Sequence, residues 1–317
     1  MDTLMILPAN RTLQSKTQKS AALVASFLSG RNERTVQAYR QDLEDFRAFA
    51  GAGDVDEAAR LLLSGGHGEA NALALAYKSS LVNRGLQAAT VNRRLAAVRS
   101  LVKLARTLGM VPWALEVENV KAESYRDTRG PGQNGFVSLM EEAGKRTDGK
   151  ATRDRALLRL LHDLALRRGE LVALDLEDVD LQAGTVAVLG KGRTQKLTMS
   201  LPDPTKAALV EWLEVRGTHP GPLFVNYDHA GKGQGRLTGT GLYLVVRSLG
   251  EKTGRKVRPH GLSHTAITEA CKAAQAHGMG LEEVMDFSRH KNVRTLMVYR
   301  DRERNVQGRL SALVAAV

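Results

Sequence analysis

The chain has 317 residues, a formal net charge of +12 and a sequence pI of about 9.9. This excess of positive charge concentrates a protein on polyanions, so nucleic acid is the expected partner. Aromatic residues make up only 4% of the chain, which argues against a basic membrane-surface helix and against a platform that stacks single-stranded bases. Duplex DNA, bound through its phosphates, is the expected ligand.

The compartment is indicated by the cysteine content and by the first residues of the chain. A single cysteine, Cys271, cannot form an intramolecular disulfide, so nothing requires an oxidising compartment. The opening stretch MDTLMILPAN has only a short apolar run and is neither a signal peptide nor a membrane span. We therefore expect a cytoplasmic protein without membrane association.

The first helices are predicted after an N-terminal extension, residues 1–19. Residues 20–50 have the pattern of two helices broken near Gly30. In the second helix, apolar residues recur at spacings of three and four and form one stripe: Val36, Tyr39, Leu43 and Phe46.

A further helix is predicted for ATVNRRLAAVRSLVKLARTLG, with Thr90 as its N-cap. Its apolar stripe consists of Val91, Leu95, Val98, Val102 and Ala105. Its other face carries the four basic residues Arg93, Arg94, Arg99 and Lys103. That face either contacts DNA phosphates or is simply solvated; the net charge favours DNA contact, and we expect replacement of Arg93 and Arg94 to weaken binding without disturbing the fold. Residues 20–115 are thus predicted to form an all-helical DNA-binding domain.

A polar stretch containing Gly-Pro-Gly, within residues 116–135, is the predicted linker. Beyond it, ATRDRALLRLLHDLALRRGELVAL is strongly helical, and GTVAVLGKGRTQKLTMSL alternates as two short strands joined at GKGRT. Further helices are expected at 203–215, 239–250, 262–276, 281–287 and near the C-terminus. Residues 136–317 are therefore predicted to form a mostly helical second domain with a small antiparallel sheet.

Common catalytic motifs are absent from the sequence. LGKGRT and HAGKGQGR are rich in glycine but neither is a phosphate-binding loop that opens a helix. HGLSH has histidines four residues apart, His260 and His264, but lacks the glutamate of a zinc protease, and no carboxylate cluster supports a metal. Cys271 is most simply a small core residue. We expect neither a metal nor another cofactor.

Four stretches carry the chemistry instead: ALRRGELVAL, LGKGRT, RPHGLSH and DFSRHKNVRTLMVYRD. In this order and at these separations they resemble the catalytic domain of tyrosine recombinases, the phage integrase family. The intervals are typical of that family, with 24 residues from Arg167 to Lys191 and 9 from His290 to Tyr299. RTVQAYRQDLEDFRAF and TVNRRLAAVRSLVKLA resemble its helical, SAM-like core-binding domain. The resemblance covers nearly all of the chain after about residue 20.

The resemblance implies a role for each matched residue. Arg167 corresponds to the first catalytic arginine, Lys191 to the general acid and Tyr299 to the nucleophile, while His260 and His290 correspond to the two histidine positions. Glu170, three residues after Arg167, is expected to share its helical face and to accept a hydrogen bond from it.

The implied reaction explains these residue types. A phosphodiester under attack becomes more negatively charged, and arginine forks and imidazoles stabilise its non-bridging oxygens. The tyrosine would form a covalent 3′-phosphotyrosine that retains the ester energy for rejoining, and a lysine would protonate the leaving 5′ oxygen. The resemblance thus implies cleavage and rejoining of duplex DNA without ATP or metal.

Ser263 departs from the family pattern, which reads His-x-x-Arg where this chain has HGLS. A serine offers one neutral donor in place of a charged bidentate fork, and loss of even a neutral donor costs on the order of 100- to 1000-fold in rate. Three explanations stay open: an engineered substitution, a natural member that recruits another cation such as Arg258, or a degenerate recombinase that only binds DNA.

The resemblance also implies an assembly. Four protomers are expected on two DNA sites, with a monomer or dimer off DNA, and DNA-bending accessory proteins are possible partners at the bacterial nucleoid. The C-terminal stretch ERNVQGRLSALVAAV sets four apolar residues on one face and docks either on a neighbouring protomer or on its own domain: Val306, Leu310, Leu313 and Val317. A non-cleaving DNA-binding accessory protein and a type IB topoisomerase-like enzyme are the alternatives.

Overall fold

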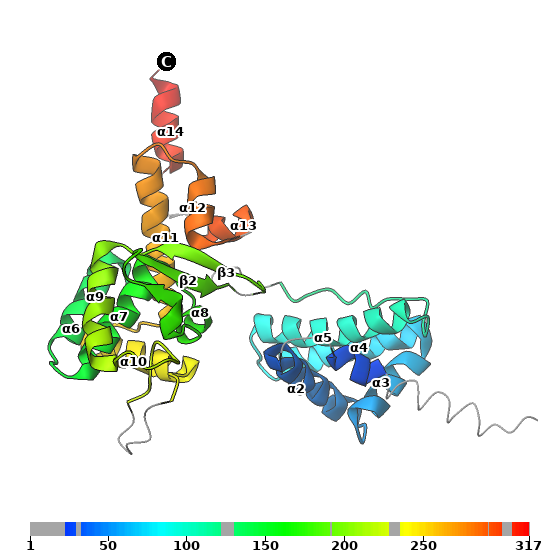
Figure 1. Ribbon diagram of the computed structural model, residues 1–317. Helices are drawn as coiled ribbons and strands as arrows, with labels where there is room; N and C mark the ends of the chain where they lie inside the picture. Colours follow the sequence, from blue (N-terminus) through cyan, green and yellow to red (C-terminus); the bar gives the residue numbers. More distant parts are fainter. Residues whose placement is uncertain are drawn as a thin grey trace, which may run out of the picture. The chain divides into compact units, whose positions relative to one another are not determined.

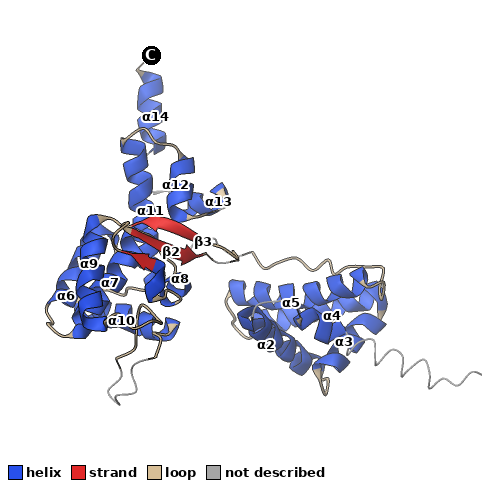
Figure 2. Ribbon diagram, viewed as in Figure 1, coloured by secondary structure: helices blue, strands red, loops and turns tan. Residues whose placement is uncertain are grey.

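The computed structural model describes residues 23–29, 33–121, 130–190, 192–227, 235–290, 292–299 and 306–316. The chain divides into two compact units, Met1–Ser124 and Tyr125–Val317, and each is described by itself. The predicted fold class is confirmed, because both units are built mainly from helices and the second contains a small antiparallel sheet (Figure 2). None of the described helices has the length and apolar content needed to cross a membrane.

The first unit is helical throughout its described part (Figure 1). After a helical turn at residues 23–28 come α2 (Glu33–Ala50), α3 (Val55–Ser64), α4 (Gly66–Asn83) and α5 (Ala88–Thr107). Leu43 and Phe46 of the predicted α2 stripe are each 1% exposed, and the Phe46 ring packs edge-on against the buried Tyr77. The helices pack around this apolar core.

The start of α5 corrects one prediction. The helix begins at Ala88 with Gln87 at its N-cap, not at Thr90. The Gln87 carbonyl accepts hydrogen bonds from the backbone N–H groups of Thr90 and Val91, at 2.8 and 3.1 Å, so the first turn is already closed there. Ala88 and Ala89 favour helix strongly and extend it backwards. The predicted apolar stripe of this helix is buried throughout.

In the second unit, helices both precede and follow the three-stranded sheet along the chain. The sheet has the order β1-β2-β3, and β2 and β3 are antiparallel with Val186 opposite Met199, so the predicted hairpin is confirmed. The elements are α6 (Gly132–Gly144), α7 (Gly149–Asp163), α8 (Arg168–Val172), η1 (Leu176–Asp178), β1 (Val179–Asp180), β2 (Thr185–Leu189), β3 (Lys196–Ser200), α9 (Asp203–Arg216), α10 (Gly239–Lys252), α11 (Pro259–Ala276), α12 (Leu281–Ser288), α13 (Val293–Leu296), η2 (Met297–Tyr299) and α14 (Val306–Ala315).

Two apolar clusters organise the second unit. The larger one includes the buried Trp212 of α9, whose indole N–H donates to the Leu223 carbonyl at 2.9 Å. The smaller one brings Ala165, Ile267 of α11 and Tyr299 together. This second cluster joins the segment before α8 to the C-terminal helices, and the candidate site is built along that junction.

Candidate active site

Arg167 lies at a sharp break between two helices. The sequence predicts one helical run here, but α7 ends at Asp163, and Ala165 adopts a left-handed φ of 47°. Arg167 is the N-cap of α8, with φ −74° and ψ 149°. The break is stabilised locally because the Glu170 carboxylate accepts the Arg167 backbone N–H at 3.0 Å, which satisfies a donor at the new helix start.

Glu170 also binds the Arg167 side chain, as predicted: Nη1 donates to Oε1 at 2.8 Å. The two residues meet through this capping arrangement and not through a shared helical face. The Glu170 side chain is only 3% exposed. Burial by itself would raise the pKa of Glu170, but hydrogen bonds from Arg167 and the charges of Arg289 and Arg167 lower that pKa below its ordinary value. An ionised Glu170 therefore orients Arg167.

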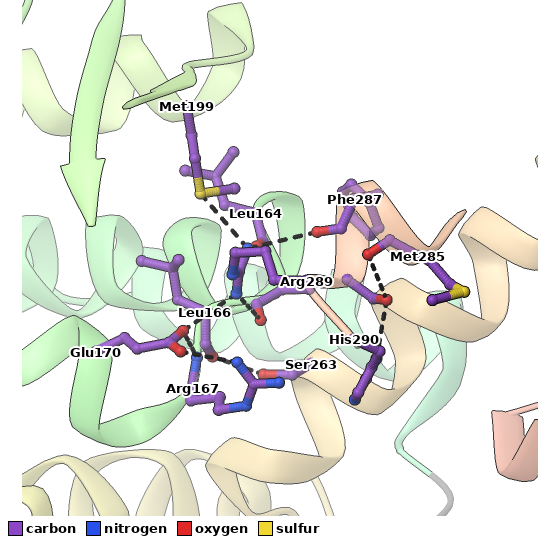
Figure 3. A network of polar contacts seen from close by, with 12 residues as sticks. Leu164, Leu166, Arg167, Glu170, Met199, Ser263, Met285, Phe287, Arg289 and His290 are labelled. Atoms are coloured by element: carbon purple, nitrogen blue, oxygen red, sulfur yellow. Dashed lines mark hydrogen bonds and ion pairs between the residues drawn. The ribbon is translucent and has the colours of Figure 1, made fainter. Parts of the chain in front are cut away.

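Arg289 is a site residue that the sequence analysis missed. Its side chain is 4% exposed and donates to the carbonyl oxygens of Leu164 at 2.8 Å and Ala165 at 2.9 Å, and to Glu170 Oε2 at 3.1 Å (Figure 3). In the sequence its only signal is its place beside His290, because the Leu164 and Ala165 carbonyls lie more than 120 residues earlier.

Ser263 contacts the same break. Its side chain is buried, and Oγ donates to the Leu166 carbonyl at 2.7 Å (Figure 3). The hydroxyl is therefore used within the fold and is not presented as a donor to a bound phosphate. Arg258, the cation considered as a substitute, is the exposed N-cap of α11.

The histidines come from two elements. α11 begins at Pro259, so His260 and His264 both lie within it, one turn apart. His290 follows α12, and its Nδ1 lies 2.8 Å from Ser288 Oγ. Desolvation and the positive charge of Arg167 lower the pKa values of His260 and His290 from the ordinary value for histidine, so both imidazoles are neutral near pH 7.

Tyr299, at the end of η2, is held between two of these imidazoles. Its ring centroid lies 4.4 Å from that of His264 and 5.4 Å from that of His290. The side chain is 7% exposed, and burial raises the pKa of its hydroxyl, partly offset by the charge of Arg167. The phenol is therefore protonated until a base takes its proton.

A pocket of about 190 Å³ lies between the Arg167 segment and the sheet. Three guanidinium groups and an imidazole line it, from Arg167, Arg193, Arg289 and His290, together with Val188, Gly190 and Leu197. An arrangement of cations around a cavity suits a phosphate group. Lys191, which follows Gly190 in the chain, lies outside the described residues.

The four basic residues predicted to bind DNA differ in their surroundings. Arg93 and Arg94 form ion pairs with Asp42 and Asp45, at 2.5 and 2.7 Å. Arg99 donates to the Val117 carbonyl at 2.9 Å and to Asn119 Oδ1. Lys103 is exposed. Three of the four residues thus hold their own domain together, whether or not they also contact DNA.

Replacement of both Arg93 and Arg94 by alanine is expected to lower the free energy of unfolding by about 2–4 kcal/mol, because the 1%-exposed Asp42 carboxylate would lose its partners. Lys103→Ala should change it by less than about 0.5 kcal/mol. Calorimetry of the full chain measures both. Equal stability of the two variants would show that the Asp42 ion pairs contribute little to folding. Because of these ion pairs, the double variant is no longer expected to leave the fold undisturbed. Lys103→Ala is therefore the cleaner test of DNA contact.

Comparison with known proteins identifies the family. The model of the phage integrase family matches residues 133–305, and that of the phage integrase N-terminal SAM-like domain matches residues 26–108. The chain belongs to the phage integrase family of tyrosine recombinases.

Individual relatives agree with this assignment. The tyrosine recombinase slr0733 of Synechocystis sp. is 34% identical, over 98% of this chain and 99% of its own length. The tyrosine recombinase Synpcc7942_B2651 of Synechococcus elongatus is 38% identical over 88% of each chain. Among solved structures, the Tn1549 transposon integrase in complex with circular intermediate DNA has a TM-score of 0.66 at 14% identity, covering 94% of this chain and 98% of that one. XerH bound to palindromic difH substrate has a TM-score of 0.64 at 16% identity, covering 99% and 91%. These structures share the fold.

Proposed function

We propose that this chain is a site-specific recombinase that cleaves and rejoins duplex DNA, with Tyr299 as the nucleophile. The observation that supports the proposal most directly is the packing of Tyr299 against His290, a residue that also lines the cation-rich pocket with Arg167. A phosphate bound in that pocket would lie beside the tyrosine.

In the proposed step, the Tyr299 hydroxyl attacks the scissile phosphorus and the bond to the 5′ oxygen breaks. Arg167 neutralises charge on the non-bridging oxygens, and the neutral imidazoles of His260 and His290 donate hydrogen bonds or accept the phenol proton. Lys191 gives its proton to the leaving 5′ oxygen. The product is a 3′-phosphotyrosine and a free 5′ hydroxyl, and the reverse attack by another 5′ hydroxyl rejoins the strand.

The proposed partner is duplex DNA carrying a specific recombination site. The net charge of +12 supports this, as do the DNA complexes of the Tn1549 integrase and XerH, which share the fold. We further propose a homotetramer on two DNA sites, with help from DNA-bending proteins, acting in the cytoplasm at the nucleoid. Of the residues proposed for C-terminal docking, Val306, Leu310 and Leu313 belong to α14, and Val317 lies outside the described residues.

A covalent-trapping experiment tests the proposed nucleophile. Host DNA segments that the full chain protects are first identified, and duplexes covering them are made. Each duplex carries a nick near the centre of the protected segment, so that the short strand released by cleavage diffuses away and cannot be rejoined. We expect a covalent adduct at a 3′ phosphate that maps to the peptide containing Tyr299. Tyr299→Phe should abolish it, and Tyr243→Phe, on α10, should not. An adduct on Tyr227 or Tyr243 would contradict the assignment.

One observation favours a second candidate, a DNA-binding protein that holds its site without cutting it. Ser263 Oγ is used by the Leu166 carbonyl, so the position where the family has an arginine supplies nothing to a phosphate. Both candidates predict an affinity for duplex DNA that falls steeply with salt. Only the recombinase predicts the covalent adduct, and its complete absence with DNA bound would favour the second candidate.

A further inference from the structure

The Arg289 side chain fixes the backbone of the helix break that precedes Arg167. Its two terminal nitrogens donate to two consecutive carbonyls, of Leu164 and Ala165, and one of them also reaches Glu170. A planar guanidinium fixes several acceptors at once in a way that a flexible ammonium does not. The two carbonyls belong to residues two and three positions before Arg167, and the carboxylate of Glu170 also binds Arg167.

The backbone on both sides of this contact is unusual. Among the described residues other than glycine, the two with left-handed φ values are Ala165 (47°) and Arg289 (58°). L residues rarely adopt this conformation, and it persists where surrounding contacts fix it. The Arg289–Ala165 hydrogen bond joins the two positions directly.

The Glu170 carboxylate is shared between the two arginines. Oε1 accepts from Arg167 Nη1, while Oε2 accepts from the Arg167 backbone N–H and from Arg289 Nη2. Removal of Arg289 would free one side of that carboxylate and two carbonyls at the break. The Glu170 carboxylate and the backbone before Arg167 would then no longer hold the Arg167 guanidinium in one orientation toward the pocket.

We propose that Arg289 is a positioning residue for DNA cleavage, acting through the 164–166 break and Glu170 to hold Arg167 in its productive orientation. This inference rests on the proposed function. Arg289 lines the pocket, but its two terminal nitrogens donate to the protein, so we expect its effect on the reaction to pass through Arg167. Misplacement of a reacting group by about 1 Å can cost on the order of 100-fold in rate.

The test compares Arg289→Gln with the unaltered chain in single-turnover adduct formation on two nicked substrates. One substrate has the natural scissile phosphate. The other has a methylphosphonate at that position, which is neutral, so a well-aligned Arg167 increases its rate of cleavage less. We expect Arg289→Gln to slow the reaction by about 10- to 100-fold on the phosphate and by less than about threefold on the methylphosphonate. DNA affinity should change by less than about threefold.

Two controls separate positioning from general damage. Arg294→Ala removes one exposed positive charge from α13 and should leave the adduct rate within about twofold. If Arg289→Gln melts far below the unaltered chain, the comparison is made with Arg289→Lys, which keeps the charge but lacks the planar fork, and the same selective loss on the phosphate substrate is expected.

Equal losses on both substrates, or no loss on either, would overturn the positioning role of Arg289. Failure of the unaltered chain to form an adduct with either substrate would instead contradict the proposed cleavage reaction itself. The two failures are therefore distinguishable in one experiment.

Discussion

Arg167→Ala is expected to lower the rate of covalent adduct formation by on the order of 1000-fold or more. The variant loses a charged fork where charge develops, and it also leaves Glu170 with fewer donors at a side chain that is 3% exposed. Its ionised carboxylate would then repel the phosphate. DNA affinity should fall by less than about tenfold, because one phosphate contact among many contributes little to binding.

The neighbouring arginine provides the matched control. Arg168 is exposed, lies next in the chain and carries the same charge, so Arg168→Ala removes an equal charge from α8 without touching Glu170. Its adduct rate should stay within about threefold of the unaltered chain. Single-turnover trapping on the nicked duplex measures both variants, and similar losses in the two would mean that overall charge, not the position of Arg167, sets the rate.

Ser263→Arg is expected to raise the rate of covalent adduct formation by at least about 100-fold. The new guanidinium would supply the cation that the resemblance of HGLS to the His-x-x-Arg pattern implies at this position. The substitution also removes the hydrogen bond to the Leu166 carbonyl, so the free energy of unfolding should fall by about 1–3 kcal/mol. Trapping gives the rate, and thermal unfolding gives the stability.

Ser263→Ala separates these two effects. It removes the same hydrogen bond but adds no charge, so it should lose stability without gaining rate. An equal gain in rate from alanine would show that the hydroxyl restrains the break, and that the added charge is not the cause. No gain from a folded Ser263→Arg would favour the non-cleaving DNA-binding alternative.

Much of the fold could be predicted from periodicity. The stripe ending in Val98, Val102 and Ala105 gave the buried face of α5, and alternation around GKGRT gave the β2–β3 hairpin. The helix break before Arg167 was missed because its residues favour helix and, apart from Glu170, the groups that stabilise it are distant in the chain. Leu164 and Ala165 bind Arg289, which no local pattern can indicate.

The sequence indicated several residues of the candidate site but not their arrangement. Motif spacing indicated Arg167, His290 and Tyr299, and the structure brings Tyr299 against His290. The ring contact with His264 had no assigned role beforehand. The left-handed conformation of Arg289 at the end of α12 was also not predicted, because a left-handed residue after a helix is usually glycine or asparagine and position 289 is neither.

The sequence separation of these contacts has a consequence for biosynthesis. Arg289 follows Leu164 by 125 residues, so at a typical translation speed the carbonyls around the break are made roughly 6–25 s before their partner. Until then, the nascent chain has Arg167 but not the hydrogen bonds that Arg289 donates to the segment before it. A polypeptide released early by a premature stop codon would carry the complete first unit, while the contacts between Arg289 and the break before Arg167 could not form.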